Sequence, residues 1–286
     1  MIKRKEKKNM TILKIIICLL IFAIIVILYA RFIGTKGLFV KEYTIEANIP
    51  SNFDGLKIVH ISDIHYGRTT KEKELKKIVE KVNLLNPDII VITGDILDKN
   101  LEVEDSKEML TKYLKEMNAK IGKYAINGNH DLKYDYWKDI IADSDFKNLN
   151  NTFETIYYDG YDSILLAGLS SYFDKQNTEE KLKDYHNFIS QNEIKYKILL
   201  LHEPDTIDEI NENFDLILAG HSHNGQVRLP LIGAIILPKG SKRYYDEYYE
   251  VKNSKLYISS GVGTSGLPIR LLDHPSINFY RINTKK

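Results

Sequence analysis

The sequence is almost free of cysteine, and its single thiol, Cys18, lies inside a long apolar run. A domain without other cysteines forms no disulfide and offers no thiolate to a metal, so its hydrophobic core must stabilise it alone. The sequence also shows no internal repeat, no low-complexity linker and no sign of a second domain. Residues 48–286 are long enough for one large core.

A strong net charge is absent as well, since the whole chain carries +1 at neutral pH. Nine Lys and Arg residues lie within residues 1–47, which leaves 31 basic against 36 acidic side chains in the remainder. A slightly acidic domain of this kind is a poor nonspecific ligand for nucleic acid. No nucleic-acid partner is therefore expected.

The N-terminal segment joins a basic stretch to an apolar run. Residues 1–14 hold six Lys and Arg residues against one Glu, and residues 15–30 are uninterruptedly apolar. A membrane span usually needs about 20 apolar residues. Lys14 and Arg31 can extend their charged ends towards the membrane surface, which lengthens the usable span. We therefore predict a transmembrane signal anchor at residues 15–33 and a single-pass protein of the cell membrane.

A cleaved signal peptide is the alternative, with Leu28-Tyr29-Ala30 as a poor cleavage site. The apolar run is long for a cleaved peptide, which favours the retained anchor. The basic stretch places residues 1–14 in the cytoplasm by the positive-inside rule, and the rest of the protein outside the cytoplasm. Residues 34–50 are interpreted as a tether and residues 51–286 as the globular domain.

Five short segments offer groups that bind metals, and all the groups are carboxylates, imidazoles or amides. Such oxygen and nitrogen donors suit Mn, Fe, Zn or Ni at a pair of sites better than a structural zinc. One Asp-x-His alone would mean little, and a single histidine is more often structural than ligating. In chain order the segments are Asp63-Ile64-His65, Gly94-Asp95-Ile96-Leu97-Asp98, Gly128-Asn129-His130-Asp131, His202 and Gly220-His221-Ser222-His223.

A short aliphatic run precedes each segment, and such runs are typical of buried strands. Between the first two strands, residues 71–86 repeat apolar side chains at helical spacing, and Pro87 follows. Strand, helix and strand in this order form a parallel crossover unit, and ligands bind at the carboxyl ends of such strands. We therefore expect the segments to meet in space. The predicted strands cover residues 56–62, 89–93, 123–126, 198–201 and 216–219.

With these motifs in this order, the sequence resembles the calcineurin-like metallophosphoesterases from about Leu56 to the C-terminus. The resemblance implies an α/β fold, a four-layer α/β/β/α sandwich with two divalent or trivalent metal ions at its rim. It implies that Asp95 bridges the two ions and that Asn129 also contacts substrate. The remaining ligands implied are Asp63, His65 and His223 for one metal, and Asn129, His202 and His221 for the other.

The same resemblance implies a metal-dependent phosphoric ester hydrolase. Two metals neutralise phosphate charge and lower the pKa of a shared water, which supplies hydroxide at neutral pH. His130 is implied to stabilise charge or protonate the leaving oxygen, with Asp131 orienting it. Asp98 is expected to hydrogen-bond a ligating histidine. Taken singly, Asp98 and Asp131 are equally well explained as helix caps or turn residues.

Two further loops resemble those of a bacterial membrane-associated branch that includes UDP-2,3-diacylglucosamine pyrophosphatase-like enzymes. Residues 220–230 match its extended motif, with Asn224 in place of a glycine, and residues 259–270 match a second motif. Arg270 and Arg68 are interpreted as contacts to substrate phosphate. The alternatives are a plain strand-to-loop return for residues 259–270 and an exposed helix-entry charge for Arg68.

Two classes of function remain. The favoured one is a membrane-anchored phosphoesterase acting on phosphomonoester, phosphodiester or pyrophosphate bonds of small-molecule, nucleotide-linked or lipid-linked substrates. The alternative is a non-catalytic, metal-dependent binding or scaffold module with the same fold. The complete ligand set together with His130 favours the enzyme.

Overall fold

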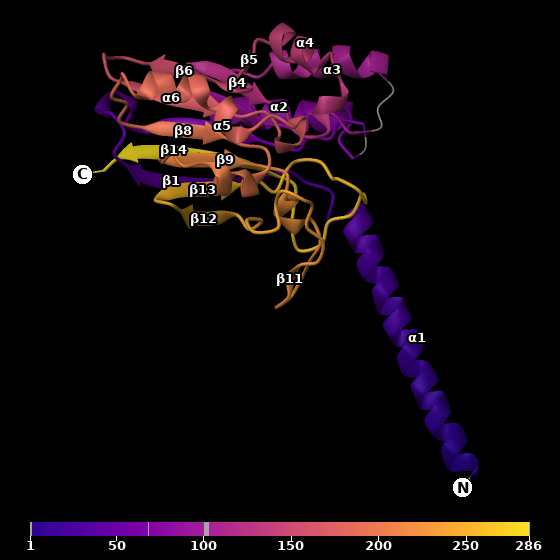
Figure 1. Cartoon of the computed structure of the whole chain (residues 1–286). Helices are drawn as coiled ribbons and strands as arrows, with labels where there is room; N and C mark the ends of the chain where they lie inside the picture. The colour runs from indigo at the N-terminus through magenta and orange to yellow at the C-terminus, as the bar shows by residue number, and fades with distance from the viewer. Residues whose placement is uncertain (1, 68, 100–102, 286) are drawn as a thin grey trace.

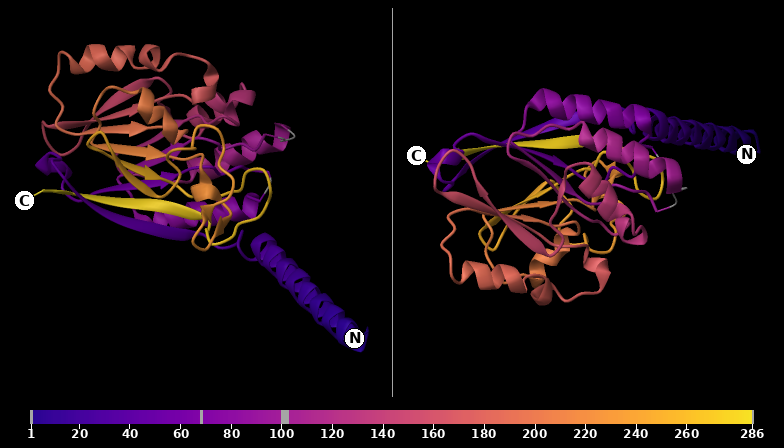
Figure 2. Two further views of the ribbon diagram at one scale, coloured as in Figure 1. Left: turned by 60° about the horizontal axis from the view of Figure 1, so that its bottom comes forward. Right: turned by 90° about the horizontal axis from the view of Figure 1, so that it is seen from above.

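The computed structural model describes residues 2–67, 69–99 and 103–285. Arg68 lies outside the described residues, so its predicted phosphate contact stays a prediction. Two six-stranded sheets pack face to face, and helices cover the outer face of each sheet (Figures 1 and 2). This arrangement confirms the predicted four-layer α/β/β/α sandwich.

The first sheet contains the predicted crossover unit. Strands β2 and β3 pair in parallel with Ile58 opposite Ile89, and helix α2 (Glu72–Leu85) connects them. Helix α2 ends at Asn86 in the left-handed conformation, directly before Pro87. The sheet order is β1 (Phe39–Ala47), β14 (Ser276–Thr284), β2 (Leu56–Ile61), β3 (Ile89–Thr93), β4 (Gly122–Ile126) and β5 (Lys147–Asn148).

The second sheet supplies the other two predicted strands, β8 and β9, which also pair in parallel. It is covered on its outer face by α5 (Thr178–Lys181), α6 (Lys183–Ile189) and the 3-10 helix η4 (Pro204–Glu209). Its order is β12 (Tyr248–Val251), β13 (Ser254–Ile258), β9 (Leu216–Ala219), β8 (Lys197–Leu200), β7 (Ser163–Gly168) and β6 (Thr152–Tyr157).

Three apolar layers hold the sandwich together. Helix α2, with α3 (Val103–Lys115) and α4 (Trp137–Asp143), packs on the outer face of the first sheet. A second layer joins the two sheets, and a third lies under α6 and η4. His60 is buried, and its Nε2 lies 2.7 Å from the Thr93 hydroxyl. Burial lowers the pKa of His60 to about 3, so this histidine is a neutral core residue.

The segment 34–50 is not the expected tether, because it contains strand β1. Residues Phe39 to Ala47 pair in parallel with Ser276 to Thr284 of the C-terminal strand β14. Apolar side chains recur along this strand, and Ile45 is buried against the second sheet. The sheet therefore begins at Phe39, and the expected domain boundary at residue 51 is wrong.

Helix α1 (Ile2–Phe32) projects away from the sandwich (Figure 1). Within the described part of the chain it is the one helix long and apolar enough to cross a membrane, over Lys7–Phe32. Its last turn contacts the domain, because the Arg270 amide donates to the Ala30 carbonyl at 2.9 Å. The remaining short elements are η1 (Ser51–Phe53), η2 (Asp131–Lys133), η3 (Tyr172–Asp174), η5 (His223–Gly225), β10 (Arg228–Leu229) and β11 (Gly233–Ala234).

Candidate metal centre

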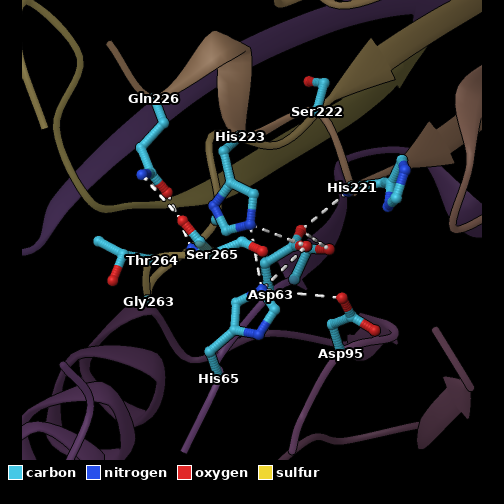
Figure 3. Close-up of polar contacts among 12 residues, drawn as sticks. Asp63, His65, Asp95, His221, Ser222, His223, Gln226, Gly263, Thr264 and Ser265 are labelled. Carbon is cyan, nitrogen blue, oxygen red and sulfur yellow. Dashed lines mark hydrogen bonds and ion pairs between the residues drawn. The ribbon is translucent and has the colours of Figure 1, made fainter. Parts of the chain in front are cut away.

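The segments predicted to bind metals meet at one end of the sandwich, where strands of both sheets end. Figure 3 shows Asp63, His65, Asp95, His221 and His223 from three of these segments. Strands β2, β3 and β4 of the first sheet and β8 and β9 of the second lead into these segments. Three overlapping groups of buried side chains place their ligand atoms within 4.8 Å of one another. The groups are Asp63, His65 and His223; His65, Asp95 and His130; and Asp95, His202 and His221.

The backbone at the ligands is unusual, because several of them adopt positive φ although none is glycine. The φ values are 53° for Asp63, 45° for His65 and 53° for Asp95. Such conformations cost about 1–3 kcal/mol each for non-glycine residues and cluster at functional sites. Hydrogen bonds between the loops hold them, with the His65 amide donating to the Asp95 carbonyl at 3.0 Å.

The first group brings a carboxylate between two imidazoles. His65 Nε2 lies 3.1 Å from His223 Nε2, and Asp63 Oδ1 lies 3.3 Å from the latter nitrogen. Donor atoms bonded to one ion at about 2.1 Å are separated by about 3 Å, so this spacing fits a shared ion. Asp63 Oδ2 is held in place by the His221 amide at 3.0 Å and by the Ser62 hydroxyl at 2.6 Å.

The second group has the same spacing. His202 Nε2 lies 3.3 Å from His221 Nδ1 and 3.4 Å from Asp95 Oδ2. The opposite ring nitrogens face backbone carbonyls: His202 Nδ1 lies 2.6 Å from Thr93 O, and His221 Nε2 lies 2.8 Å from Lys239 O. Donation to these carbonyls fixes each tautomer and leaves the facing nitrogens free to bind a metal.

Asp95 lies between the two groups. Its Oδ2 is 3.7 Å from His65 Nε2 on one side and 3.4 Å from His202 Nε2 on the other. Its Oδ1 accepts a hydrogen bond from the His130 amide at 2.8 Å, which fixes the carboxylate plane. This position fits the expected bridging carboxylate.

The electrostatics suit cation binding. Although burial opposes ionisation, the surrounding histidines hold the pKa of Asp63 and of Asp95 well below the usual range. Burial holds the pKa of His223 well below its usual value, with Asp63 opposing and nearby positive charge assisting. Burial opposes protonation of His202, but Asp95 and other nearby carboxylates hold its pKa well above the usual value. A divalent ion would take the place of this proton and keep the carboxylates ionised.

Buried polar atoms without partners support the same conclusion. Within the described residues, Asp63 Oδ1 and Asn129 Oδ1 are buried and accept no hydrogen bond. Unpaired buried acceptors are costly and call for an explanation, such as an ion. The residues therefore fit the metals that the sequence resemblance implies.

Two loop residues show why the segments approach so closely. Gly94 has φ of +91°, and a Cβ there would lie 2.7 Å from His202 Nδ1. A Cβ at Gly220 would lie 2.7 Å from Asp63 Oδ2.

Asn224 adopts φ of +50°, which confirms that asparagine preserves this left-handed turn of the extended motif.

His130 lines the site, but Asp131 does not pair with its ring. The Asp131 carboxylate accepts hydrogen bonds from the Leu97 amide at 3.0 Å and the Gly128 amide at 2.9 Å. His130 Nδ1 is buried and has no partner in the described part of the chain. The expected orientation of His130 by Asp131 is thus replaced by a role in holding two ligand loops together. Burial and then Asp95 raise the pKa of Asp131 to about 7.

His130 Nε2 lies 3.9 Å from Asp95 Oδ2, and the ring packs edge-on against His65 with centroids 4.7 Å apart. Burial lowers the pKa of His130 to about 4. Asp98 is buried close by, and its charge helps to raise the pKa of His65. Burial opposes that rise, whereas Asp63 and Asp95 contribute more to it than Asp98 does. The expected hydrogen bond between Asp98 and a ligating histidine stays a prediction.

Arg270 does not reach into the site as a phosphate contact. Its guanidinium is fully buried, paired with Asp273, and donates to the carbonyls of Ser260 at 2.6 Å and Gly263 at 2.7 Å. Nη2 also lies 3.3 Å from His223 Nδ1. The expected substrate contact is therefore replaced by a positioning role behind His223.

A cavity of about 410 Å³ opens beside the ligands. Its lining includes Asp95, Asn129 and His130, and it also includes the apolar side chains of Ile235, Ile236, Leu267 and Ile269. Sequence reasoning missed this apolar lining, although the apolar run at residues 229–238 marked it. It also missed Ser62, whose hydroxyl donates to the adjacent Asp63, and Thr93, whose carbonyl faces His202 of the other sheet.

The comparisons with known proteins agree with this geometry. The family model described as calcineurin-like phosphoesterase matches residues 56–225. A metallophosphoesterase of Bacillus subtilis, YkuE, is 32% identical over 90% of this chain and 89% of its own length. The UDP-2,3-diacylglucosamine pyrophosphatase LpxG of Chlamydia trachomatis is 29% identical over 64% of this chain and 69% of its own length. A Danio rerio transmembrane protein with a metallophosphoesterase domain is 27% identical over 80% of this chain and 53% of its own length.

Proposed function

This chain belongs to the calcineurin-like phosphoesterase family, and on that premise we propose that it is a membrane-anchored, dinuclear-metal phosphoesterase. It hydrolyses phosphomonoester, phosphodiester or pyrophosphate bonds. The observation that carries the proposal is the carboxylate of Asp95, which lies within 3.7 Å of an imidazole from each ligand group.

In this proposal Asp63, His65 and His223 would hold one ion, Asn129, His202 and His221 would hold the other, and Asp95 would supply its carboxylate to both. When bound, the two ions neutralise phosphate charge and lower the pKa of a water molecule. The carbonyls of Thr93 and Lys239 keep His202 and His221 in the tautomers that ligation needs.

His130 is proposed to act on the leaving oxygen. Its ring lines the cavity beside Asp95 and Asn129, so a phosphate ester in the cavity lies within its reach. Its amide donates to Asp95, which fixes the backbone of His130 relative to the ligands. Burial keeps the free ring neutral at pH 7, because it lowers the pKa of His130 to about 4. A phosphate anion bound beside the ring would raise that pKa, and the imidazolium would then stabilise charge or give a proton to the departing group.

Helix α1 supports the membrane assignment by its length and apolar composition. The six basic residues before the apolar run favour a cytoplasmic N-terminus, with the phosphoesterase domain outside the cytoplasm. The similarity to LpxG keeps UDP-2,3-diacylglucosamine-type molecules as a candidate substrate class. An outward-facing domain would instead meet phosphorylated lipids or metabolites outside the cytoplasm.

The test is hydrolysis of bis-p-nitrophenyl phosphate and p-nitrophenyl phosphate by the purified full chain in detergent. Activity should depend on added Mn²⁺, disappear with a chelator, and return with fresh metal. His202→Ala should lose it, whereas Asp139→Asn should retain it, because Asp139 pairs only with the exposed Lys107 in the described structure. Metal bound in full without turnover on any ester would support the binding-module alternative instead.

A further inference from the structure

An exposed apolar surface borders the metal centre. We call it the apolar rim, and it comprises the end of β10, the turn that leads to β11, the residues that follow β11, and two leucines from a neighbouring loop. Ile232 is 72% exposed, Leu267 is 65% exposed and Leu231 is fully exposed. Its members are Leu229, Leu231, Ile232, Ile235, Ile236, Leu267 and Leu272.

The apolar rim is firmly attached to the ligand loops. The Arg228 guanidinium donates to the Asn224 carbonyl at 2.9 Å, one residue after the ligand His223. A side chain at Gly225 would collide with Ala234 of the hairpin. The Gln226 side chain accepts from the Ser265 amide at 2.9 Å (Figure 3). It also donates to the Leu267 carbonyl at 2.9 Å. These contacts therefore fix the position of the apolar rim relative to the metal ligands.

The apolar rim also lies beside the exit of helix α1. Leu267 and Leu272 flank Arg270, whose amide donates to the Ala30 carbonyl in the last turn of α1 at 2.9 Å. Substitution of Gly34 would bring a Cβ into contact with the Arg270 carbonyl, so this junction is closely packed. The hairpin projects from the side of the domain from which α1 leaves (Figure 1).

From this geometry we propose that the apolar rim inserts into the surface of the same lipid bilayer that α1 spans. Contiguous exposed apolar side chains mark interaction sites. Leucine and isoleucine side chains at a membrane surface are stabilised when they enter the boundary between the lipid headgroups and the acyl chains. A bilayer is the binding partner that this position favours, because helix α1 ends at the same loop that carries Leu267 and Leu272. A soluble partner on this face would have to displace lipid.

What membrane insertion of the rim implies for substrate binding in the cavity rests on the proposed function. Metal ligands line the cavity together with Ile235, Ile236 and Leu267 of the apolar rim. A bilayer at the rim would therefore face this apolar lining. The substrate class that fits is an amphiphile, with its phosphate at the ligands and its chain along the rim.

Fluorescence quenching by brominated lipids tests the insertion. Trp137 is the only tryptophan and is buried, so it gives a constant background. The full chain carrying Ile232→Trp is reconstituted in vesicles whose acyl chains are brominated near the headgroup. The added fluorescence should be strongly quenched. Tyr161→Trp is the matched control, since Tyr161 is fully exposed in the β6–β7 turn beside Asn52, beyond the far end of β1. Its fluorescence should be unchanged.

The outcomes separate the two proposals. Unquenched fluorescence from Ile232→Trp, and also from Leu231→Trp, in protein that still hydrolyses bis-p-nitrophenyl phosphate would overturn the insertion alone. Absence of hydrolysis in the wild type would remove the proposed function but leave the quenching result readable.

Inhibition by alkyl phosphates tests the cavity. Decyl phosphate should inhibit better than ethyl phosphate, and Ile236→Ser should weaken decyl phosphate about tenfold because it removes an apolar contact to the chain. Inhibition by ethyl phosphate should stay unchanged, as should both inhibitors in the control Tyr161→Ser. Equal inhibition of the wild type by both phosphates would exclude the amphiphile.

Discussion

Replacement of the shared carboxylate by Asp95→Asn is the most informative perturbation of this centre. The amide keeps the size of the side chain and its acceptor for the His130 amide but removes the negative charge. Two unit charges 4 Å apart interact by about 4 kcal/mol at an effective dielectric constant of 20. Each ion should therefore lose about 4 kcal/mol, or about 1000-fold in affinity, as a lower estimate for divalent ions.

The measurement is metal content and affinity of the purified full chain, by mass spectrometry and by titration against a chelator of known affinity. Asp95→Asn should lose both ions together. His65→Ala should mainly empty the group it shares with Asp63 and His223, and His221→Ala should mainly empty the other. Asp139→Asn, the same chemical change at an exposed ion pair, should retain both ions.

Two results would contradict the reasoning. Two ions bound to Asp95→Asn with wild-type affinity would show that Asp95 is not shared. Loss of a single ion, with the other unaffected, would assign Asp95 to one group only.

Further expectations concern catalysis, stability and topology. His130→Asn should retain both metals and lower turnover by about 10²–10⁴-fold, less for p-nitrophenyl than for alkyl esters; stoichiometric metal loss would make His130 a ligand. Arg270→Met should cost about 3–5 kcal/mol in urea unfolding, because Asp273 stays buried without its ion-pair partner, although it keeps the hydrogen bond from Asn224. Adding Asp273→Leu to that variant should restore part of the loss; a stable Arg270→Met variant with a raised KM would instead indicate a phosphate contact. His60 is protonated only in the unfolded chain between about pH 6.5 and 3, so it should contribute a loss of about 1.4 kcal/mol of stability per pH unit as the pH falls through this range. His60→Leu should make the measured slope shallower by that amount. Protease added to wall-stripped intact cells should digest the domain and spare a cytoplasmic control; full protection would reverse the topology and restore cytoplasmic nucleotide-linked lipids as leading substrates.

The sandwich and the ligand cluster could be predicted because local pattern and topology agree. The aliphatic run at residues 89–93 forms β3 with the predicted bounds, and the helical spacing after residue 71 forms α2. Parallel strands then carry Asp63 and Asp95 to one edge of the sheet. The bounds of these strands and helices depend on residues close in sequence. The rule that crossover connections join neighbouring parallel strands then predicts that the ligands meet.

The wrong predictions share a different cause. Strand β1 is stabilised by pairing with β14, more than 200 residues later, and that partner is not visible from residues 39–47 alone. The burial of Arg270 depends on Asp273 and on carbonyls of the preceding loop. The sequence around Arg270 therefore did not indicate that its role is structural. Asp131 likewise binds the amides of Leu97 and Gly128, which only the folded loops bring within reach.

The hydrogen bond between the last turn of α1 and Arg270 has a consequence for how substrate is found. A flexible tether would let the domain search a volume, whereas this junction fixes the height of the metal centre above the end of α1. With α1 in a bilayer, the centre would sweep a single plane as the protein diffuses laterally. Turnover of a membrane-borne substrate should then follow its surface density, and dilution of the vesicles at constant lipid composition should leave the rate per enzyme unchanged.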